Sequence, residues 1–509
     1  MSDVRTNEEL AEATASGIRW ITLARAGIEV LLLGSMVLLA RLIPPADFGM
    51  FAVALIVQEL SRNIPSEGIG GAIVQRKTLE RIHLQTGLAM SLISGVAFTI
   101  LALILAVVLV KPLYGEETSH LIMLTTPCFL IGAILALPMS MLRRRLDFRR
   151  LSMLDITQSV VRTLTTIVLA AGFGLDASAL VLGVVVGLAV ALVLALAFCP
   201  VPLPRWNTGA ARDLLHYGGP AALAAVAWTG FRNGDYAVIG ARLGAAQAGF
   251  YWRGFQLAVE YQRKVSTVMT QIAFPVLSRT AGSAELYAIR RRMVQLLTVM
   301  LFPLLVALVI LAPSVVPWIF GPTWEPAVLP TQILAGAGAA TVVIDAVGSV
   351  LMAQGRTRAL LGYGVAHFVV YVSAVVFAAG WGLTGVSIAA VVVHGVFLVI
   401  AYLVLLWGRE ESALRFMWED MGAAAVSCVA LVAVALPVER LLSGADAPAV
   451  LHLVLVGIAG ACAYLAALRL LFPGAWGDLI GLIRRVLPSG RPVRAFARRL
   501  TVATGRSSS

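Results

Sequence analysis

The sequence predicts an all-α integral membrane protein with fourteen transmembrane helices. Of its 509 residues, 59% are hydrophobic and only 13% are charged, whereas soluble domains carry about 25% charged residues. Apolar stretches of about 20 residues, the length that crosses a bilayer core, recur along the whole chain between short polar breaks. Stretches such as residues 180–198, LVLGVVVGLAVALVLALAF, are apolar on every side. They lack the alternation of membrane β-barrel strands, so helices are the expected spanning elements.

The expected spans follow these apolar stretches in order along the chain. Before the first span, residues 1–16 form a polar, acidic segment. This segment lacks the basic start and apolar core of a secretory signal, so we expect the first helix to stay in the protein. The fourteen expected spans are 17–41, 46–66, 83–110, 119–141, 154–175, 177–199, 216–240, 247–278, 292–320, 328–353, 358–378, 383–408, 416–437 and 448–472.

The four cysteines give no sign of a metal site or a disulfide framework. They lie far apart, inside or at the ends of expected spans, which fits neither type of spacing. We therefore expect them to be small packing residues. They are Cys128, Cys199, Cys428 and Cys462.

The basic residues predict the orientation of the chain in the membrane. Of the 39 Lys and Arg residues, 28 lie in segments on the same side as the N-terminus, and seven lie within spans. The opposite side holds only Arg41, Lys111, Arg242 and Arg440. By the positive-inside rule, we expect both termini to be cytoplasmic. The net charge of +12 is then explained by topology and anionic lipid, and no nucleic-acid partner is expected.

Two short repeats indicate an internal duplication. LAAGFGL at 169–175 recurs as FAAGWGL at 377–383, and ARLIPPADFGMF at 40–51 resembles ARLGAAQAGFY at 241–251 with one residue deleted. We therefore expect two six-helix bundles. An even number of spans in each copy gives both copies the same orientation, with a pseudo-two-fold axis along the membrane normal. The bundles are 17–199 and 216–408, followed by two peripheral helices in 416–472 and a basic cytoplasmic tail, 473–509, that begins with a short amphipathic piece.

Charged residues inside the expected spans gather on helices 1, 2, 7 and 8. An ionised side chain at the bilayer centre costs at least about 2.5–3.5 kcal/mol unless it has a partner or water. Six of the seven basic residues lie on these four helices, and Arg162 on helix 5 is the exception. Acidic residues accompany them at helical spacing, so each pair shares one helix face. The pairs are Arg25 with Glu29, Glu59 with Arg62, Arg232 with Asp235, and Glu260 with Arg263 and Lys264.

This arrangement has two interpretations. The first is a set of ion pairs that hold a bundle together. The second, which we favour, is a water-filled chamber between the two halves, lined by cations that bind an anionic substrate such as a diphosphate, because guanidinium groups match two phosphate oxygens at once. The expected substrate-binding residues are Arg25, Arg232, Arg253, Arg263, Lys264 and Arg62, with Glu29, Glu59, Asp235, Glu260 and Asp345 as counter-ions or coupling-ion ligands.

Three polar residues, Arg62 among them, have an open interpretation. Arg62 lies near the inner end of its helix, where it could also be a residue that extends to the membrane surface. Asp155 could bind a coupling proton or cation, or serve as a cap or packing residue. For His394, we favour a hydrogen-bonded packing role over titration near neutral pH.

Several stretches resemble a known family. They are LARLIPPADFGMFAVALIV, FRNGDYAVIGARLGAAQAGFYWRGFQLA, FPVLSR at 274–279 and IFGPTWEPAVLPTQILA at 319–335. They are similar to the polysaccharide and lipid-linked oligosaccharide flippases of the multidrug/oligosaccharidyl-lipid/polysaccharide exporter superfamily. The resemblance implies a V-shaped cavity and alternating access. It also implies movement of an undecaprenyl-diphosphate-linked glycan from the inner to the outer leaflet of the bacterial plasma membrane.

The same resemblance has implications for single residues and partners. It implies functional roles for Arg25, Arg232 and Arg253. Arg263 and Lys264 stand where the family is often apolar, which favours a more acidic glycan. Membrane lipid and the lipid-linked glycan are the expected partners, and other polysaccharide-assembly proteins are possible ones.

Other functions fit the sequence less well. A multidrug antiporter or a major-facilitator exporter would not require this cation-rich lining. A membrane glycan polymerase or ligase would be expected to carry a large outer loop, and no outer loop here exceeds about a dozen residues. No Walker loop, metal-ligand cluster or nucleophile constellation is found in the sequence. We therefore expect no enzyme activity and no cofactor, with a proton, a sodium ion or the membrane potential as the energy source.

Overall fold

The computed structural model describes residues 27–279, 284–407, 410–445 and 447–486. Over these residues the protein is helical, with no β-strand, which confirms the all-α class. The chain divides into two compact units, the first ending at Gly249 and the second beginning at Phe250. Arg25, the N-terminal segment 1–16 and the basic part of the tail, 487–509, lie outside the described residues.

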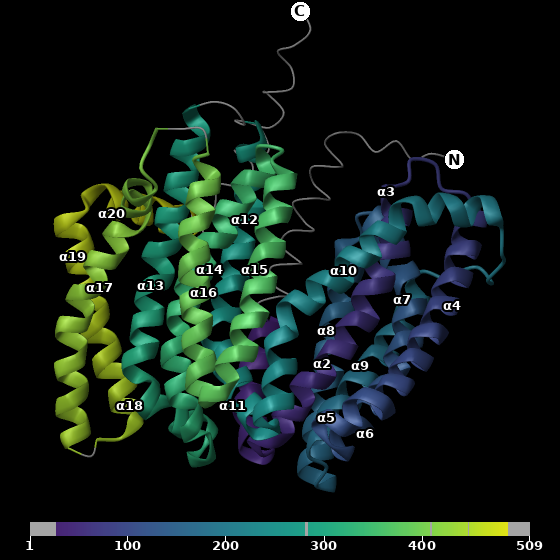
Figure 1. Ribbon diagram of the computed structural model, residues 1–509, viewed down its shortest axis with the longest axis horizontal. Helices are drawn as coiled ribbons and strands as arrows, with labels where there is room; N and C mark the ends of the chain where they lie inside the picture. The colour runs from purple at the N-terminus through teal and green to yellow at the C-terminus, as the bar shows by residue number, and fades with distance from the viewer. Residues whose placement is uncertain (1–26, 280–283, 408–409, 446, 487–509) are drawn as a thin grey trace, which may run out of the picture. The chain divides into compact units, whose positions relative to one another are not determined.

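The first unit is built from apolar helices joined by short turns (Figure 1). A helix over residues 27–42 precedes the elements that carry labels. Two helices of this unit are extended by a π-helical turn, η1 after α2 and η2 after α4, a feature that is common at functional sites. The elements are α2 Pro45–Pro65, η1 Ser66–Gly70, α3 Gly71–Gln75, α4 Arg81–Leu105, η2 Ala106–Val110, α5 Lys111–Tyr114, α6 Glu116–Thr125, α7 Pro127–Arg144, α8 Phe148–Phe173, α9 Ala177–Phe198 and α10 Thr208–Leu243.

The second unit contains the remaining helices. Helix α11 spans Ala245–Phe255, so the boundary between the units falls within it. The elements that follow are η3 Gln256–Glu260, α12 Tyr261–Arg279, α13 Ala284–Phe320, η4 Pro322–Ala327, α14 Val328–Ala353, α15 Thr357–Ala378, η5 Ala379–Trp381, α16 Gly382–Leu405, α17 Ala413–Gly444, α18 Ala449–Leu451, η6 His452–Val456, α19 Gly457–Leu471 and α20 Pro473–Val486.

Nine helical stretches of the described residues are long and apolar enough to cross a membrane. They cover ten of the fourteen expected spans, because Arg358–Leu405 contains two. Four helices outside this set, α2, α10, α11 and α12, carry most of the expected intramembrane charges. The chain is thus a multi-span helical membrane protein, while the count of fourteen spans and the overall symmetry stay predictions.

Helix α10 belongs to the first unit, although the expected second bundle begins at residue 216. It packs along α2 and against α4, and Asn233 Nδ2 on α10 donates a hydrogen bond to Glu59 Oε2 on α2 over 3.0 Å. In a second hydrogen bond between these helices, Asn63 Nδ2 on α2 donates to Thr229 Oγ1 on α10 over 3.2 Å. The division into two six-helix bundles stays a prediction.

A close crossing of α2 and α11 joins the two copies of the ARL repeat within the first unit. A Cβ atom on Gly49 would lie 1.7 Å from the carbonyl oxygen of Ala245, and one on Gly249 would lie 1.9 Å from that of Pro45. In the aligned repeats Gly49 corresponds to Gly249, and Pro45 to Ala245. The contact is therefore reciprocal, as in an interface built on a local two-fold relation. Small residues allow this approach of two helix backbones.

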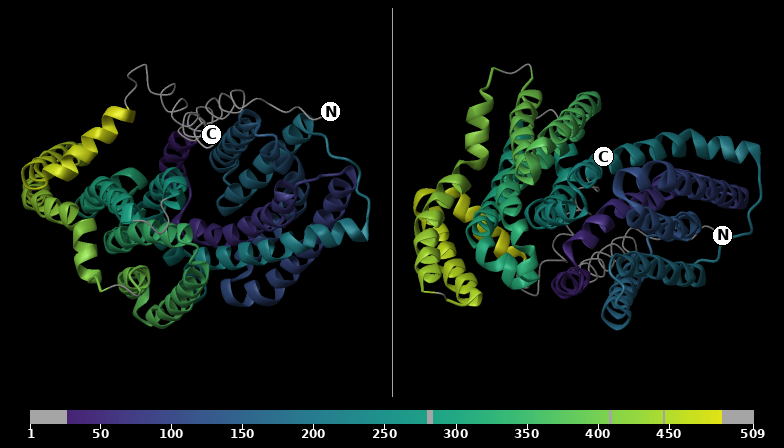
Figure 2. Two further views of the ribbon diagram at one scale, coloured as in Figure 1. Left: turned by 90° about the horizontal axis from the view of Figure 1, so that it is seen from above. Right: turned by 60° about the horizontal axis from the view of Figure 1, so that its bottom comes forward.

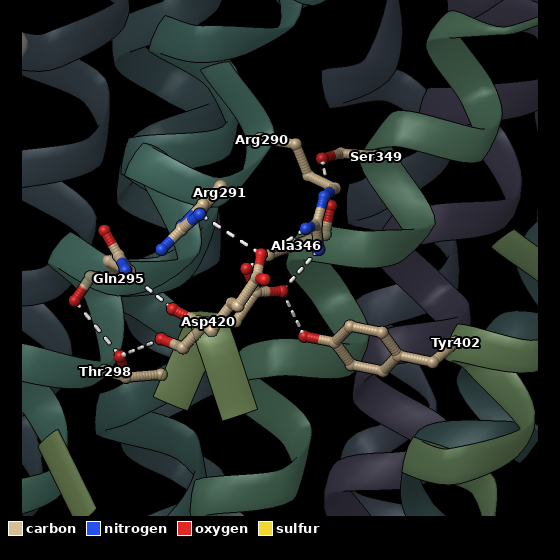
Figure 3. A network of polar contacts seen from close by, with 9 residues as sticks. Arg290, Arg291, Gln295, Thr298, Ala346, Ser349, Tyr402 and Asp420 are labelled. Atoms are coloured by element: carbon tan, nitrogen blue, oxygen red, sulfur yellow. Dashed lines mark hydrogen bonds and ion pairs between the residues drawn. The ribbon is translucent and has the colours of Figure 1, made fainter. Parts of the chain in front are cut away.

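In the second unit, a buried ion pair fixes α17 to α13 (Figure 3). Arg290 and Asp420 are each 1% exposed, and both terminal nitrogens of the guanidinium contact the carboxylate, with 3.1 Å from Nη2 to Oδ1. The Tyr402 hydroxyl donates to Asp420 Oδ2 over 2.5 Å, and Thr298 Oγ1 donates to the Asp420 carbonyl oxygen over 3.2 Å. The first of the two helices expected to be peripheral is thus attached by buried charge that the sequence analysis did not assign.

The far end of α17 is held by a second polar cluster in the same unit. Glu439 accepts a hydrogen bond from Ser314 Oγ over 2.7 Å and lies 2.7 Å from His452 Nδ1. All three side chains are buried or partly buried. Helices α17 and α19 lie side by side, and α20 lies across the ends of α13 and α19 (Figure 2). Arg292 of α13 pairs with Asp478 of α20 over 2.5 Å, so the expected amphipathic piece is a helix packed on this unit.

Candidate functional site

A polar cavity of about 480 Å³ lies inside the first unit. Its size is within the range of about 300–1,000 Å³ that is typical of small-molecule sites. It is enclosed by the helix over 27–42 and by α2, η1, α7, α8 and α9. The lining residues are Ile28, Gln58, Arg62, Asn63, Ser66, Glu67, Gly132, Leu135, Ala136, Met139, Arg143, Asp155, Gln158, Ser159, Arg162 and Leu188.

Helix α8 supplies a polar face to this cavity. Asp155, Gln158, Ser159 and Arg162 follow the spacing i, i+3, i+4 and i+7, so they lie on one side of the helix. A close approach of α9 fixes this face, because a Cβ atom on Gly187 would lie 2.8 Å from the carbonyl oxygen of Gln158. Because position 187 on α9 is a glycine, the backbones of α8 and α9 can come into van der Waals contact.

Three guanidinium groups converge on the cavity from three helices. Arg62 comes from α2, Arg143 from α7 and Arg162 from α8. Arg143 Nη1 also donates a hydrogen bond to Ser66 Oγ over 3.2 Å. Two carboxylates, Asp155 and Glu67, share the lining, so its formal charge is positive. Guanidinium groups bind phosphate or carboxylate oxygens in pairs, and the neighbouring amides and hydroxyls suit the hydroxyl groups of a sugar.

The structure brings together residues that the sequence analysis kept apart. Arg62 is an expected binding residue and does line the cavity, where its side chain is exposed. Arg162 was expected to lie away from the other charges, yet it lines the same cavity. Asp155 joins them. The polar spacing along α8 was the signal that could have identified Arg162 and Asp155 from the sequence.

The other charges of the first unit have different surroundings. Glu59 accepts its hydrogen bond from Asn233. Asp235 on α10 is 1% exposed, and Arg232 is partly buried. Glu29 is partly buried in the helix over 27–42. The roles expected for these four residues stay predictions.

Arg253 is enclosed by aromatic rings in the second unit. Its side chain is 1% exposed, and its guanidinium carbon lies 5.0 Å from the ring centres of Phe320 and Trp324 and 5.1 Å from that of Trp252. Its Nη1 donates to Gln256 Oε1 over 3.0 Å. Cation–π contacts of this kind stabilise a buried cation. In this conformation Arg253 is a packed residue, and a direct contact with substrate would require it to become exposed.

Arg263 belongs to a small charged group in the second unit. It pairs with Glu260 over 3.2 Å, at the expected i+3 spacing, and its Nε lies 3.9 Å from Asp345 Oδ2 on α14. Lys264 Nζ lies 4.9 Å from the ring centre of Tyr261. The expected counter-ions Glu260 and Asp345 are therefore placed beside Arg263.

His394 has the hydrogen-bonded packing position that the sequence analysis favoured. Its Nδ1 lies 2.8 Å from the Ala390 carbonyl oxygen, one turn earlier in α16. Its ring packs against His367 and Tyr371, with ring centres 4.9 and 5.2 Å apart.

Comparisons with known proteins agree on one kind of protein. Residues 38–329 match the model of a family described as "Polysaccharide biosynthesis protein". The chain is 25% identical over 404 residues to the lipopolysaccharide biosynthesis protein WzxC of Escherichia coli (strain K12), covering 78% of this chain and 82% of that protein. It is 23% identical over 390 residues to the teichuronic acid biosynthesis protein TuaB of Bacillus subtilis (strain 168), covering 73% and 80%.

Two solved structures share the fold. The lipid II flippase MurJ in an inward closed conformation matches with a TM-score of 0.70 and 14% identity, covering 90% of this chain and 99% of that one. An inward-facing multidrug resistance MATE family transporter of the MOP superfamily matches with a TM-score of 0.61 and 16% identity, covering 77% and 95%. At these identities the likeness shows the fold.

Proposed function

Because the chain belongs to the polysaccharide biosynthesis protein family, we propose that it is a flippase for a lipid-linked oligosaccharide. The family match confirms the resemblance found in the sequence. The proposed substrate is an undecaprenyl-diphosphate-linked repeat unit that moves from the inner to the outer leaflet of the bacterial plasma membrane. The observation that carries this proposal is the arginine-lined polar cavity inside an otherwise apolar bundle.

The chemistry of the cavity fits such a substrate. A diphosphate and a sugar cannot cross the hydrocarbon core unaided, because desolvating their charges and hydroxyl groups is costly. Arg62, Arg143 and Arg162 offer guanidinium forks to phosphate oxygens, and the amide and hydroxyl groups beside them can replace the water around a sugar. The isoprenoid chain would stay in lipid.

Alternating access is the mechanism we propose for release to the other side. Asp155 and Glu67 lower the net charge of the cavity, so a bound anion is held less tightly and can leave. At Gly49 and Gly249, the backbones of α2 and α11 are in direct contact. We propose that this contact separates when the cavity opens outward. We also propose that both termini lie in the cytoplasm. An ion gradient or the membrane potential is the proposed energy source.

The test is a gene deletion with matched complementation. If the proposal is correct, the deletion strain accumulates a lipid-linked glycan in the inner leaflet, and the wild-type gene clears it. Arg62→Ala and Arg162→Ala should each reduce export at least about tenfold, which corresponds to about 1.4 kcal/mol of lost binding. Arg358→Ala changes an exposed arginine on α15 and serves as the control.

Two outcomes would count against the proposal. If both cavity variants export fully at normal protein levels, the substrate does not pass through this cavity. A multidrug antiporter is the second candidate function, because the fold is similar to that of a MATE transporter. This candidate would be supported if no lipid-linked intermediate accumulates in the deletion strain while its sensitivity to drugs rises. Accumulation of exported but unpolymerised units would instead indicate a glycan polymerase or ligase.

A further inference from the structure

A groove beside the first turns of α10 is separate from the cavity described above. It lies on the first unit and has a volume of about 460 Å³. Its lining comes from the start of α10 and from the residue two positions before it. The lining residues are Trp206, Thr208, Ala211, Arg212, Leu215 and His216.

The rest of the unit holds this segment firmly. Ala211 and Leu214 are buried in an apolar core with Leu137 of α7. Asp213 pairs with Arg76 over 2.9 Å, which anchors the same turn from another side. The carbonyl oxygen of residue 205 accepts a hydrogen bond from Thr86 Oγ1 over 3.1 Å. The groove is therefore part of a rigid surface.

The face of the segment that bears the groove has the composition of a membrane interface. Trp206 is 54% exposed and Leu215 is 53% exposed. Arg212 and His216 are also exposed beside them. Exposing large apolar side chains to water is unfavourable, whereas tryptophan beside arginine is typical of the headgroup region of a bilayer.

The course of the helix agrees with this location. The first turns of α10 run across the end of the unit, and the rest of the helix turns to run along it (Figures 1 and 2). Pro220 lies inside α10, and a proline within a helix removes a backbone hydrogen bond and permits a bend. A helix that lies across the end of a membrane bundle with one apolar face uncovered is suited to the plane of the headgroups.

We propose that this groove binds the headgroup of an anionic phospholipid. Arg212 pairs with the lipid phosphate, because the nearby carboxylate of Asp213 is already paired with Arg76. The Trp206 ring lies at the level of the glycerol, and Leu215 contacts the acyl chains. His216 adds a second polar contact to the headgroup.

The position of the groove gives the bound lipid a mechanical role. The same helix carries Asn233, which binds Glu59 of α2 next to the cavity lining residue Gln58. A lipid at the start of α10 fixes one end of this helix at the membrane surface. The inference does not depend on which molecule the cavity transports.

Native mass spectrometry of the purified full-length protein tests the proposal. Phosphatidylglycerol and phosphatidylcholine are titrated against the wild type, Arg212→Ala, Trp206→Ala and Arg212→Lys. We expect one phosphatidylglycerol to bind the wild type at least about tenfold more tightly than phosphatidylcholine. The alanine variants should lose this preference, and the lysine variant should keep part of it because it keeps the charge.

The controls make the result decisive. Arg358→Ala removes an exposed arginine of α15 and should leave phosphatidylglycerol binding unchanged. All these side chains are exposed, so the variants should fold, and their melting temperatures check this. Equal binding of both lipids by the wild type, or unchanged phosphatidylglycerol binding by Arg212→Ala, would overturn the proposal.

Discussion

Gly49 on α2 and Ala245 on α11 form a contact between two helix backbones in which there is no room for a side chain. A Cβ atom at position 49 would lie 1.7 Å from the Ala245 carbonyl oxygen, and the equivalent atom at position 249 would lie 1.9 Å from the Pro45 carbonyl oxygen. Real contacts of this type are about twice as long, so a substitution at either glycine must move a helix. The contact joins the two copies of one sequence repeat.

Alanine at either glycine should therefore disable transport. We expect Gly49→Ala and Gly249→Ala each to reduce export at least about tenfold, because the conformation with these backbones in contact is lost. Export of the lipid-linked glycan in the deletion strain measures the effect. Gly172→Ala, on α8 with open space around its α-carbon, is the control and should export normally. Normal export by both crossing variants would show that this contact is not needed.

Replacing Asp420 should destabilise the second unit strongly. Asp420→Ala leaves the buried guanidinium of Arg290 without its carboxylate, a change that typically costs about 3–5 kcal/mol. The melting temperature of the purified protein should fall by several degrees. Arg291→Ala breaks only the partly exposed pair with Glu419 and should change stability by about 0–1 kcal/mol. Equal effects of the two variants would argue that the buried pair contributes no more than a surface pair.

The cluster at the other end of α17 should contribute less. Glu439→Leu removes the acceptor for Ser314 and the partner of His452. Ser314 and His452 then keep only their mutual contact of 3.1 Å, so we expect a loss of about 1–3 kcal/mol. Ser443→Ala removes only a long contact of 3.5 Å to the same carboxylate and serves as the control in thermal unfolding. A loss of stability that is no larger than that of the control would contradict this assignment.

Asp155 should affect release more than binding. Asp155→Asn keeps the shape of the side chain and removes one negative charge from a cavity that holds three arginines. A diphosphate should then bind more tightly, because less charge opposes it. We expect a lower export rate together with a lower dissociation constant for soluble prenyl diphosphate, measured by calorimetry on the purified protein. Weaker binding by this variant would show that Asp155 holds the substrate directly.

The apolar spans were predictable because each depends only on local composition. Helix α9 was expected over 177–199 and is found at Ala177–Phe198, and α14 coincides with its expected range, 328–353. The start of α13 was less predictable. Its first turns are charged, so the apolar stretch begins later than the helix, which starts at Ala284.

The site was predictable only where its signal is local. Arg62 was expected as a binding residue from its position inside an apolar span. The enclosure of Arg253 could not be expected, because Phe320 and Trp324 lie about 70 positions further along the chain. Arg290 lies just before the expected span 292–320, and nothing near it in the sequence indicates that Asp420 will cover it.

The burial of Arg290 also constrains how the protein can be made. Asp420 is 130 residues further along the chain, so α13, which carries Arg290, is synthesised long before the carboxylate that neutralises this guanidinium exists. A nascent chain that has reached the end of α16 contains every residue that lines the cavity. Its Arg290 side chain must still be hydrated or held by the insertion machinery. A premature stop codon between α16 and α17 should therefore give a product that membrane proteases remove, even though no residue of the cavity has been lost.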